Sequence, residues 1–362
     1  MTYALIRGDI RIAAYDPSMH LSMNLTARWI AALLSAVLAA STVRAAAPEN
    51  PHHLPLDPKQ VLGNEACEKC HASEVATWKK TPHSTTFLTL HQKKEANDIA
   101  KKLGLSSIKR GQVCIECHYT PQTTEHATQA KAISGVSCES CHGAAQKWVT
   151  LHNDYGSPTA TKAQESEAHK AQRISGSIAA GMRNPHNLYL VAQSCFRCHT
   201  VPNEKLVNVG KHQAGTENFE LVAWSQGLVR HNFLENNGKV NRPLSDERLR
   251  VMYVVGQIAD LEFSLRATAE ATEKATYGVT SAQRTDRAAK RLMELQTKLN
   301  NSIIEQILDA YKGVKIKLNN REQLLACAVK IATLGEQFAD ETSGNDLAPV
   351  QPLLPGVEKY KK

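Results

Sequence analysis

The chain has 362 residues, and 43 Lys and Arg against 35 Asp and Glu give it a formal net charge of +8. Only 5% of the residues are aromatic, which is few for a chain whose length predicts two domains. A positive charge can indicate binding to nucleic acid, but no basic run with interleaved aromatic residues is present. We therefore expect no nucleic-acid partner.

Residues 23–47 have the features of a secretory signal peptide. Arg28 ends a short basic region, an apolar run follows over residues 29–40, and small residues offer cleavage after Ala45 or Ala47. The apolar run is too short to cross a bilayer. We predict a periplasmic protein that associates with a membrane only through a partner or an uncleaved signal.

One pattern, Cys-x-x-Cys-His, occurs four times. Its copies contain Cys67, Cys70 and His71; Cys114, Cys117 and His118; Cys138, Cys141 and His142; and Cys195, Cys198 and His199. The pattern is typical of c-type haem attachment, in which two thiols bond to the vinyl groups of one porphyrin and the histidine binds its iron. A disulfide framework gives no reason for the histidine, and zinc needs two further ligands at set spacing. We predict four covalently bound haem c groups, whose bulk would replace the missing aromatic residues.

Further histidines are available as second iron ligands. Beyond the signal and the motifs, the chain has His52, His53, His83, His91, His126, His152, His169, His186, His212 and His231. Met182 is the only methionine in this region, so two histidines per iron are expected, with low or moderate reduction potentials. His83 follows His71 by twelve residues, roughly 18 Å along a helix, so it cannot bind the same iron. The same argument separates His152 from His142.

The sequence changes character at Ser245, which is a predicted helix cap. Apolar residues then recur at intervals of three and four in three runs, which predict three amphipathic helices in an antiparallel bundle or a cap over the haem region. The runs contain Val251, Val254, Ile258, Leu261 and Leu265; Leu292, Leu295, Leu299, Ile303 and Ile307; and Leu324, Cys327, Ile331, Leu334 and Phe338. Cys327 lies among them as a small buried hydrophobic residue.

The predicted fold is mainly α, with a multihaem cytochrome c domain that has little regular sheet and a C-terminal bundle of about three helices. The expected organisation is an upstream segment with the signal peptide (1–47), a tetrahaem domain (48–240), a helical bundle (241–341) and a Pro-rich basic tail (342–362). Within the tetrahaem domain, the polar residues 154–177 are expected to form a surface excursion.

The motif arrangement resembles the tetrahaem cytochrome c-554 family over residues 64 to about 235. The first motif is followed by Trp78-x-x-Thr81-x-His83, the second and third lie close together in sequence, and Gly143 directly follows the third. The C-terminal helices are a departure from the short members of this family.

The resemblance implies a set of second iron ligands. His83 would bind the third haem and His152 the first, while the second haem, on His118, would lack a strong second ligand. In this family the haems pack as stacked pairs. For the fourth haem the choice is His231, with two alternatives, His186 and His212.

We expect an electron carrier that connects a periplasmic dehydrogenase or other redox enzyme with another cytochrome. The resemblance suggests electrons from the oxidation of hydroxylamine or other nitrogen compounds. One alternative is an enzyme that acts on nitric oxide or hydroxylamine at an open second haem, with Tyr119, His91 or His126 as proton donor. Another is a haem sensor or assembly subunit that docks through the helical bundle.

Overall fold

The computed structural model describes residues 56–124, 127, 129–234 and 238–361. The predicted signal peptide, His52, His53 and His126 lie outside these residues. The described residues belong to one compact unit. Within the described part the unit is mainly helical, with one antiparallel pair of short strands, β1 (Thr120–Gln122) and β2 (Lys131–Ser134). The predicted mainly α class is confirmed. No helix in the described residues is long and apolar enough to cross a membrane.

The second and third Cys-x-x-Cys-His motifs lie on short helices, whereas the first begins in a short helix and ends at His71, directly before the next one. The elements in this part are α2 (Asn64–Glu68), α3 (Ala72–Trp78), α4 (Pro82–Thr89), η2 (Leu90–Gln92), α5 (Lys94–Lys102), α6 (Gln112–His118) and α7 (Cys138–His142). The spacing of the motif places its cysteines and its histidine at i, i+3 and i+4, which is one face of a helix. Helices α6 and α7 each end at the histidine of their motif.

The middle of the chain leads to the fourth motif. It contains η3 (Lys162–Gln164), α8 (Glu167–Ala179), α9 (Leu188–His199), α10 (Glu204–Asn208) and α11 (Leu221–Ser225). The expected surface excursion therefore contains a regular helix, α8, which the Ser166 hydroxyl caps by accepting from the His169 backbone N–H at 3.3 Å. Helix α9 ends at His199, as α6 and α7 do at theirs.

Four long helices follow: α12 (Asp246–Ala269), α13 (Thr276–Leu299), α14 (Ser302–Lys312) and α15 (Arg321–Glu341). Ser245 caps α12 by accepting from the Arg248 N–H, as predicted. The second predicted helix is divided in two, because Asn300 adopts a left-handed conformation with φ 45° and ends α13. Asn301 then caps α14.

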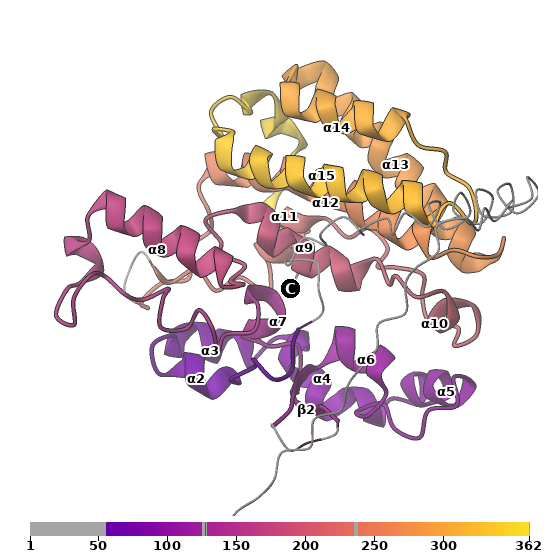
Figure 1. The fold of residues 1–362 in the computed structure, drawn as a ribbon, viewed down its shortest axis with the longest axis horizontal. Coiled ribbons are helices and arrows are strands. Elements are labelled where there is room, and N and C mark those ends of the chain that lie inside the picture. Colours follow the sequence, from indigo (N-terminus) through magenta and orange to yellow (C-terminus); the bar gives the residue numbers. More distant parts are fainter. Residues whose placement is uncertain (1–55, 125–126, 128, 235–237, 362) are drawn as a thin grey trace, which may run out of the picture. The chain divides into compact units, whose positions relative to one another are not determined.

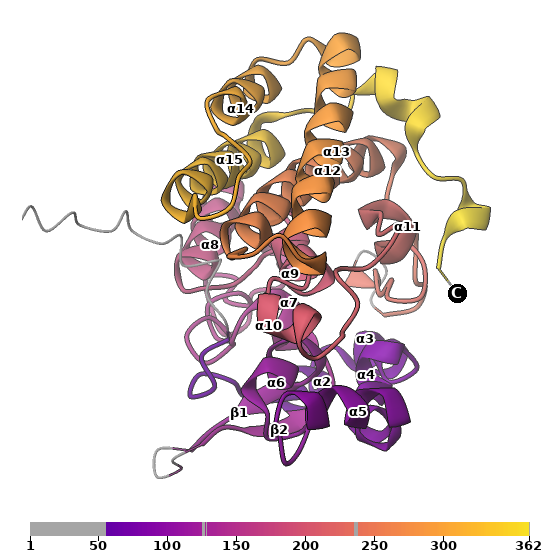
Figure 2. The same ribbon diagram turned by 90° about the vertical axis from the view of Figure 1, so that its right-hand side faces the viewer.

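Helix α9 joins the haem region to these long helices. Figures 1 and 2 show α12, α13, α14 and α15 together on one side of α9. Tyr189 and Phe196 of α9 are fully buried in the same hydrophobic cluster as Ile258 of α12 and Phe338 of α15. The predicted boundary at residue 241 therefore lies inside one compact unit with a shared core.

The last residues pack onto this unit. They form two short helices, η5 (Ala348–Leu353) and η6 (Val357–Lys359), and Val350 is completely buried. Lys361 accepts a hydrogen bond from the Leu228 N–H at 2.7 Å and donates one to the Ala223 carbonyl at 3.0 Å. The segment that we expected as a tail thus covers the end of α11.

Candidate haem sites

Each motif histidine faces one further histidine from elsewhere in the chain. The distances between ring centroids are 6.3 Å for His71 and His152, 6.2 Å for His118 and His212, 6.1 Å for His142 and His231, and 6.4 Å for His199 and His83. The four partners come from segments far apart in sequence, including α4 and the loops that follow α7, α10 and α11.

This separation is that of two imidazoles on opposite sides of one metal ion. A metal–nitrogen distance of about 2.0 Å on each side puts the two ring centroids about 6 Å apart. Rings in direct contact lie closer, as His199 and Phe219 show with centroids 4.3 Å apart and an angle of 16° between their planes. The four histidine pairs therefore fit iron atoms with two axial histidines.

Hydrogen bonds orient most of these imidazoles. Five of the eight have Nδ1 within hydrogen-bonding distance of an oxygen: the Arg183 carbonyl for His142 (3.3 Å), the Val149 carbonyl for His152 (2.7 Å), Thr216 Oγ1 for His199 (2.8 Å), the Gln213 carbonyl for His212 (2.9 Å) and the Val229 carbonyl for His231 (2.7 Å). A proton on Nδ1 satisfies these oxygens and leaves the Nε2 lone pair free for a metal.

Burial keeps the central imidazoles neutral. It lowers the pKa of His118 to about 4, with a further contribution from the charge of His212, and that of His142 to about 4, with a contribution from His231. The pKa of His199 falls to about 3, again mainly through burial and then through His83. Neutral imidazole is the form that binds iron, so these rings are ready to coordinate at pH 7.

The pairing agrees with one expected ligand and differs for the others. His152 faces His71, as the resemblance implied. His83, however, faces the histidine of the fourth motif and His231 that of the third, the reverse of what we expected. The argument from chain length only excluded binding to the iron of the motif that comes directly before each histidine. It could not choose among the irons of the other three motifs.

The second motif also differs from expectation. His118 was expected to lack a strong partner, but His212 lies opposite it. His212 was considered only for the fourth haem, because nothing in the local sequence relates it to residues 114–118. The other alternative, His186, is exposed.

The motif cysteines are free thiols in the structure, with no disulfides among them. In the described part of the chain, no group of three or more potential ligands could hold a metal ion on its own. The histidines thus occur as opposed pairs beside paired thiols, an arrangement that suits a porphyrin rather than the tetrahedral set that zinc requires.

The four motifs contact one another. The thiols of Cys67 in the first motif and Cys138 in the third shift each other's pKa, which is lowered for Cys67 and raised for Cys138, and Cys198 Sγ of the fourth motif donates to the Glu116 carbonyl of the second at 3.8 Å. Ser194, next to the fourth motif, donates to the Cys141 carbonyl at 2.8 Å. The sites therefore fall into two pairs, first with third and second with fourth, which are joined through the third and fourth motifs.

Buried donors without a protein acceptor lie beside these sites. Among the described residues they include Nε1 of Trp148 and of Trp224, whose rings are 5.2 Å from His152 and 5.3 Å from His199. Nε of Arg197, inside the fourth motif, has no partner either. Such donors fit the carboxylates of a bound haem.

A helical fold with four opposed histidine pairs and four paired-cysteine motifs defines a c-type cytochrome. Residues 66–143 match the family described as cytochrome c554 and c-prime. Cytochrome c-554 of Nitrosomonas europaea is 29% identical over 105 residues, which are 26% of this chain and 43% of that protein. The N-terminal part of this chain is therefore similar to the cytochrome c-554 family, which agrees with haem c bound at the paired-cysteine motifs. The chain matches less than half of the length of this relative, and no solved structure matches it.

Proposed function

We propose that the protein is a periplasmic electron carrier that holds four haem c groups, each between two histidines. The observation that carries this proposal is the set of four histidine pairs with centroids 6.1–6.4 Å apart. Bound haem c supplies an iron that alternates between the ferric and ferrous states. The chain supplies neutral imidazoles on both sides and brings the four attachment motifs into contact, which favours transfer from site to site.

The pairing argues for a carrier rather than a catalyst. An open axial position is needed to bind and activate a small molecule, whereas two axial ligands suit electron transfer. The enzyme alternative depended on an open second haem, and His212 lies opposite His118 at 6.2 Å. We assign no catalytic residue.

The partners that suit this function are other redox proteins, namely a donor dehydrogenase or cytochrome and an acceptor cytochrome. An origin of the electrons in the oxidation of nitrogen compounds rests only on the likeness to cytochrome c-554. The long helices contribute to the core around α9, so a sensor or assembly role that docks through them has no separate support.

Two measurements on the exported protein test this function. The intact mass should exceed that of the processed polypeptide by four haem groups. Electron paramagnetic resonance of the oxidised protein should show low-spin iron at all four sites, because two histidines produce a strong ligand field. A mass without haem, or high-spin iron in the unmodified protein, would contradict the proposal.

A further inference from the structure

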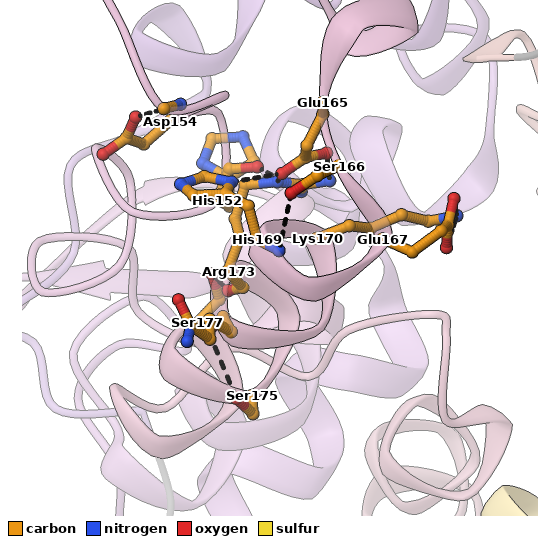
Figure 3. A network of polar contacts seen from close by, with 12 residues as sticks. His152, Asp154, Glu165, Ser166, Glu167, His169, Lys170, Arg173, Ser175 and Ser177 are labelled. Atoms are coloured by element: carbon orange, nitrogen blue, oxygen red, sulfur yellow. Dashed lines mark hydrogen bonds and ion pairs between the residues drawn. The ribbon is translucent and has the colours of Figure 1, made fainter.

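His152 lies outside any helix and depends on its surroundings for its position. It belongs to a turn over residues 146–153, where its ring is held by the Val149 carbonyl and the edge of Trp148. Its backbone is held from a different element: Arg173 of α8 donates from Nη1 to the His152 carbonyl at 2.8 Å. Figure 3 shows Arg173, Glu165 and His169 gathered beside His152.

The guanidinium of Arg173 is fixed on its other edge. Nε and Nη2 each donate to one oxygen of Glu165 at 2.7 Å, which makes a bidentate pair. The Glu165 side chain is 2% exposed and that of Arg173 is 12% exposed, so water screens the pair little. A planar, bidentate pair of this kind has a defined direction as well as strength. With the guanidinium held in this way, Nη1 is directed at the His152 carbonyl.

Further contacts hold both members of the pair. His169 Nδ1 lies 2.8 Å from Glu165 Oε1. The guanidinium of Arg173 lies over the ring of Tyr155, 5.1 Å from its centroid. Hydrogen bonds from Arg173, and then from His169, hold the pKa of Glu165 at about 2. The carboxylate is therefore charged at any pH at which the protein functions.

We propose that Arg173, fixed by Glu165, is a positioning residue for the second ligand of the first haem. The pair holds the turn that carries His152 at the distance from His71 that an iron between them requires. This inference rests on the proposed function, because it assumes that His71 and His152 share one haem. Without the Arg173–Glu165 pair, the turn that carries His152 can move away from His71. The first haem would then lose its second histidine ligand.

The test replaces Arg173 by Met in the full, haem-loaded protein. We expect high-spin ferric iron at one haem of the four, cyanide binding at that haem, and the same spectrum as His152→Ala gives. Adding Arg173→Met to His152→Ala should change nothing more. Arg173→Lys should give a smaller high-spin fraction, because an ammonium group can still donate to the carbonyl.

Lys170→Met is the matched control, because it removes a positive charge from the same helix at an exposed pair with Glu167. Its spectrum should equal that of the unmodified protein, and a high-spin fraction as large as in Arg173→Met would overturn the proposal. So would a fully low-spin Arg173→Met protein with four haems. That outcome would leave the proposed function intact, whereas high-spin iron in the unmodified protein would remove the proposed function itself.

Glu165→Gln tests the positioning role of Arg173 if the Arg173→Met protein cannot be produced with four haems. The amide keeps the size of the side chain but loses the charged bidentate pair, so we expect a shifted reduction potential at one haem and partial high-spin character there. An unchanged potential and an unchanged spin state in Glu165→Gln would overturn the positioning role.

Discussion

His212 lies in the loop between α10 and α11, and its ring faces His118 across 6.2 Å. Its Nδ1 hydrogen-bonds with the Gln213 carbonyl, so its Nε2 is the nitrogen available for iron. This single residue separates two of the functions that the sequence left open, the electron carrier and the enzyme. With His212, the proposed second haem has a histidine on each side of its iron. Without it, one side of the iron would be open to a small ligand, as in a catalytic haem.

Replacing His212 by Ala should therefore open the second haem. We expect high-spin iron at one site of four and binding of cyanide or nitric oxide, neither of which the unmodified protein should show, because an empty axial position accepts small ligands. Electron paramagnetic resonance and optical titration measure both effects. His186→Ala, at an exposed histidine, is the control. Binding of cyanide by the unmodified protein at the His118 site would favour the enzyme instead.

The motif histidines and cysteines could be predicted from the sequence, because their chemistry depends on spacing within five residues. The partners of those histidines could not, because a pairing such as His83 with His199 is made by tertiary structure. Spacing along the chain excluded some histidine pairings but gave no reason to prefer any one of the others. Contacts such as that of Arg173 with His152 carry no sequence signal at all.

At the level of elements, α9 connects two kinds of structure. Its last residues form the fourth motif, whereas Tyr189 and Phe196 belong to the core of the long helices. The Tyr189 hydroxyl donates to the buried Glu262 carboxylate of α12 at 2.6 Å. Arg284 of α13 donates to the His199 carbonyl at 3.3 Å. The long helices therefore help to build the fourth haem site.

A substitution at the contact between α15 and α9 tests this dependence. A Cβ atom on Gly335 would lie 2.2 Å from the ring of Tyr189, so Gly335→Ala must displace α9 or α15. We expect a loss of about 1–3 kcal/mol in the free energy of unfolding, as for other overpacked cores, together with an altered spectrum of one haem.

Gly176→Ala is the matched control, because it also lies inside a helix but a Cβ there meets nothing within 4 Å. It should leave stability unchanged or raise it by about 0.5–1 kcal/mol through helix propensity. Denaturant titration measures both variants. Equal stability of the two would argue against the close packing of α15 on α9.

The helices were predictable to different degrees. Apolar periodicity located the long C-terminal helices, but the division between α13 and α14 depends on the left-handed Asn300, for which the sequence has no glycine or proline signal. Helix α8 was missed, because its surface is polar and only Ser177 is buried. Its role depends on a contact with the turn at His152 rather than on a buried face.

For the whole molecule, the distribution of hydrophobic side chains matters most. The large cluster lies in α9 and α12–α15, whereas the described residues before α7 contribute one small cluster of Ala100, Ile108, Ile115 and Tyr119. This agrees with the low aromatic content of the chain and with haem as the filling of the N-terminal half. Both halves meet at α9, within one compact unit.

We therefore expect a single unfolding transition. Because α9 belongs to both halves, loss of the long helices should remove support from the fourth haem site at the same denaturant concentration. Helix content by circular dichroism and axial ligation by Soret absorbance should give coincident curves. A first step that removes most of the helix signal and leaves the Soret band unchanged would show two independent domains instead.

The double role of α9 also constrains the order of assembly. Cys195 is partly buried and packs against the core formed by the long helices, so docking of α12 reduces access to its thiol. Attachment of a haem, as proposed, requires that thiol to be accessible. We therefore expect haem attachment at the fourth motif to be faster before the C-terminal helices dock than after.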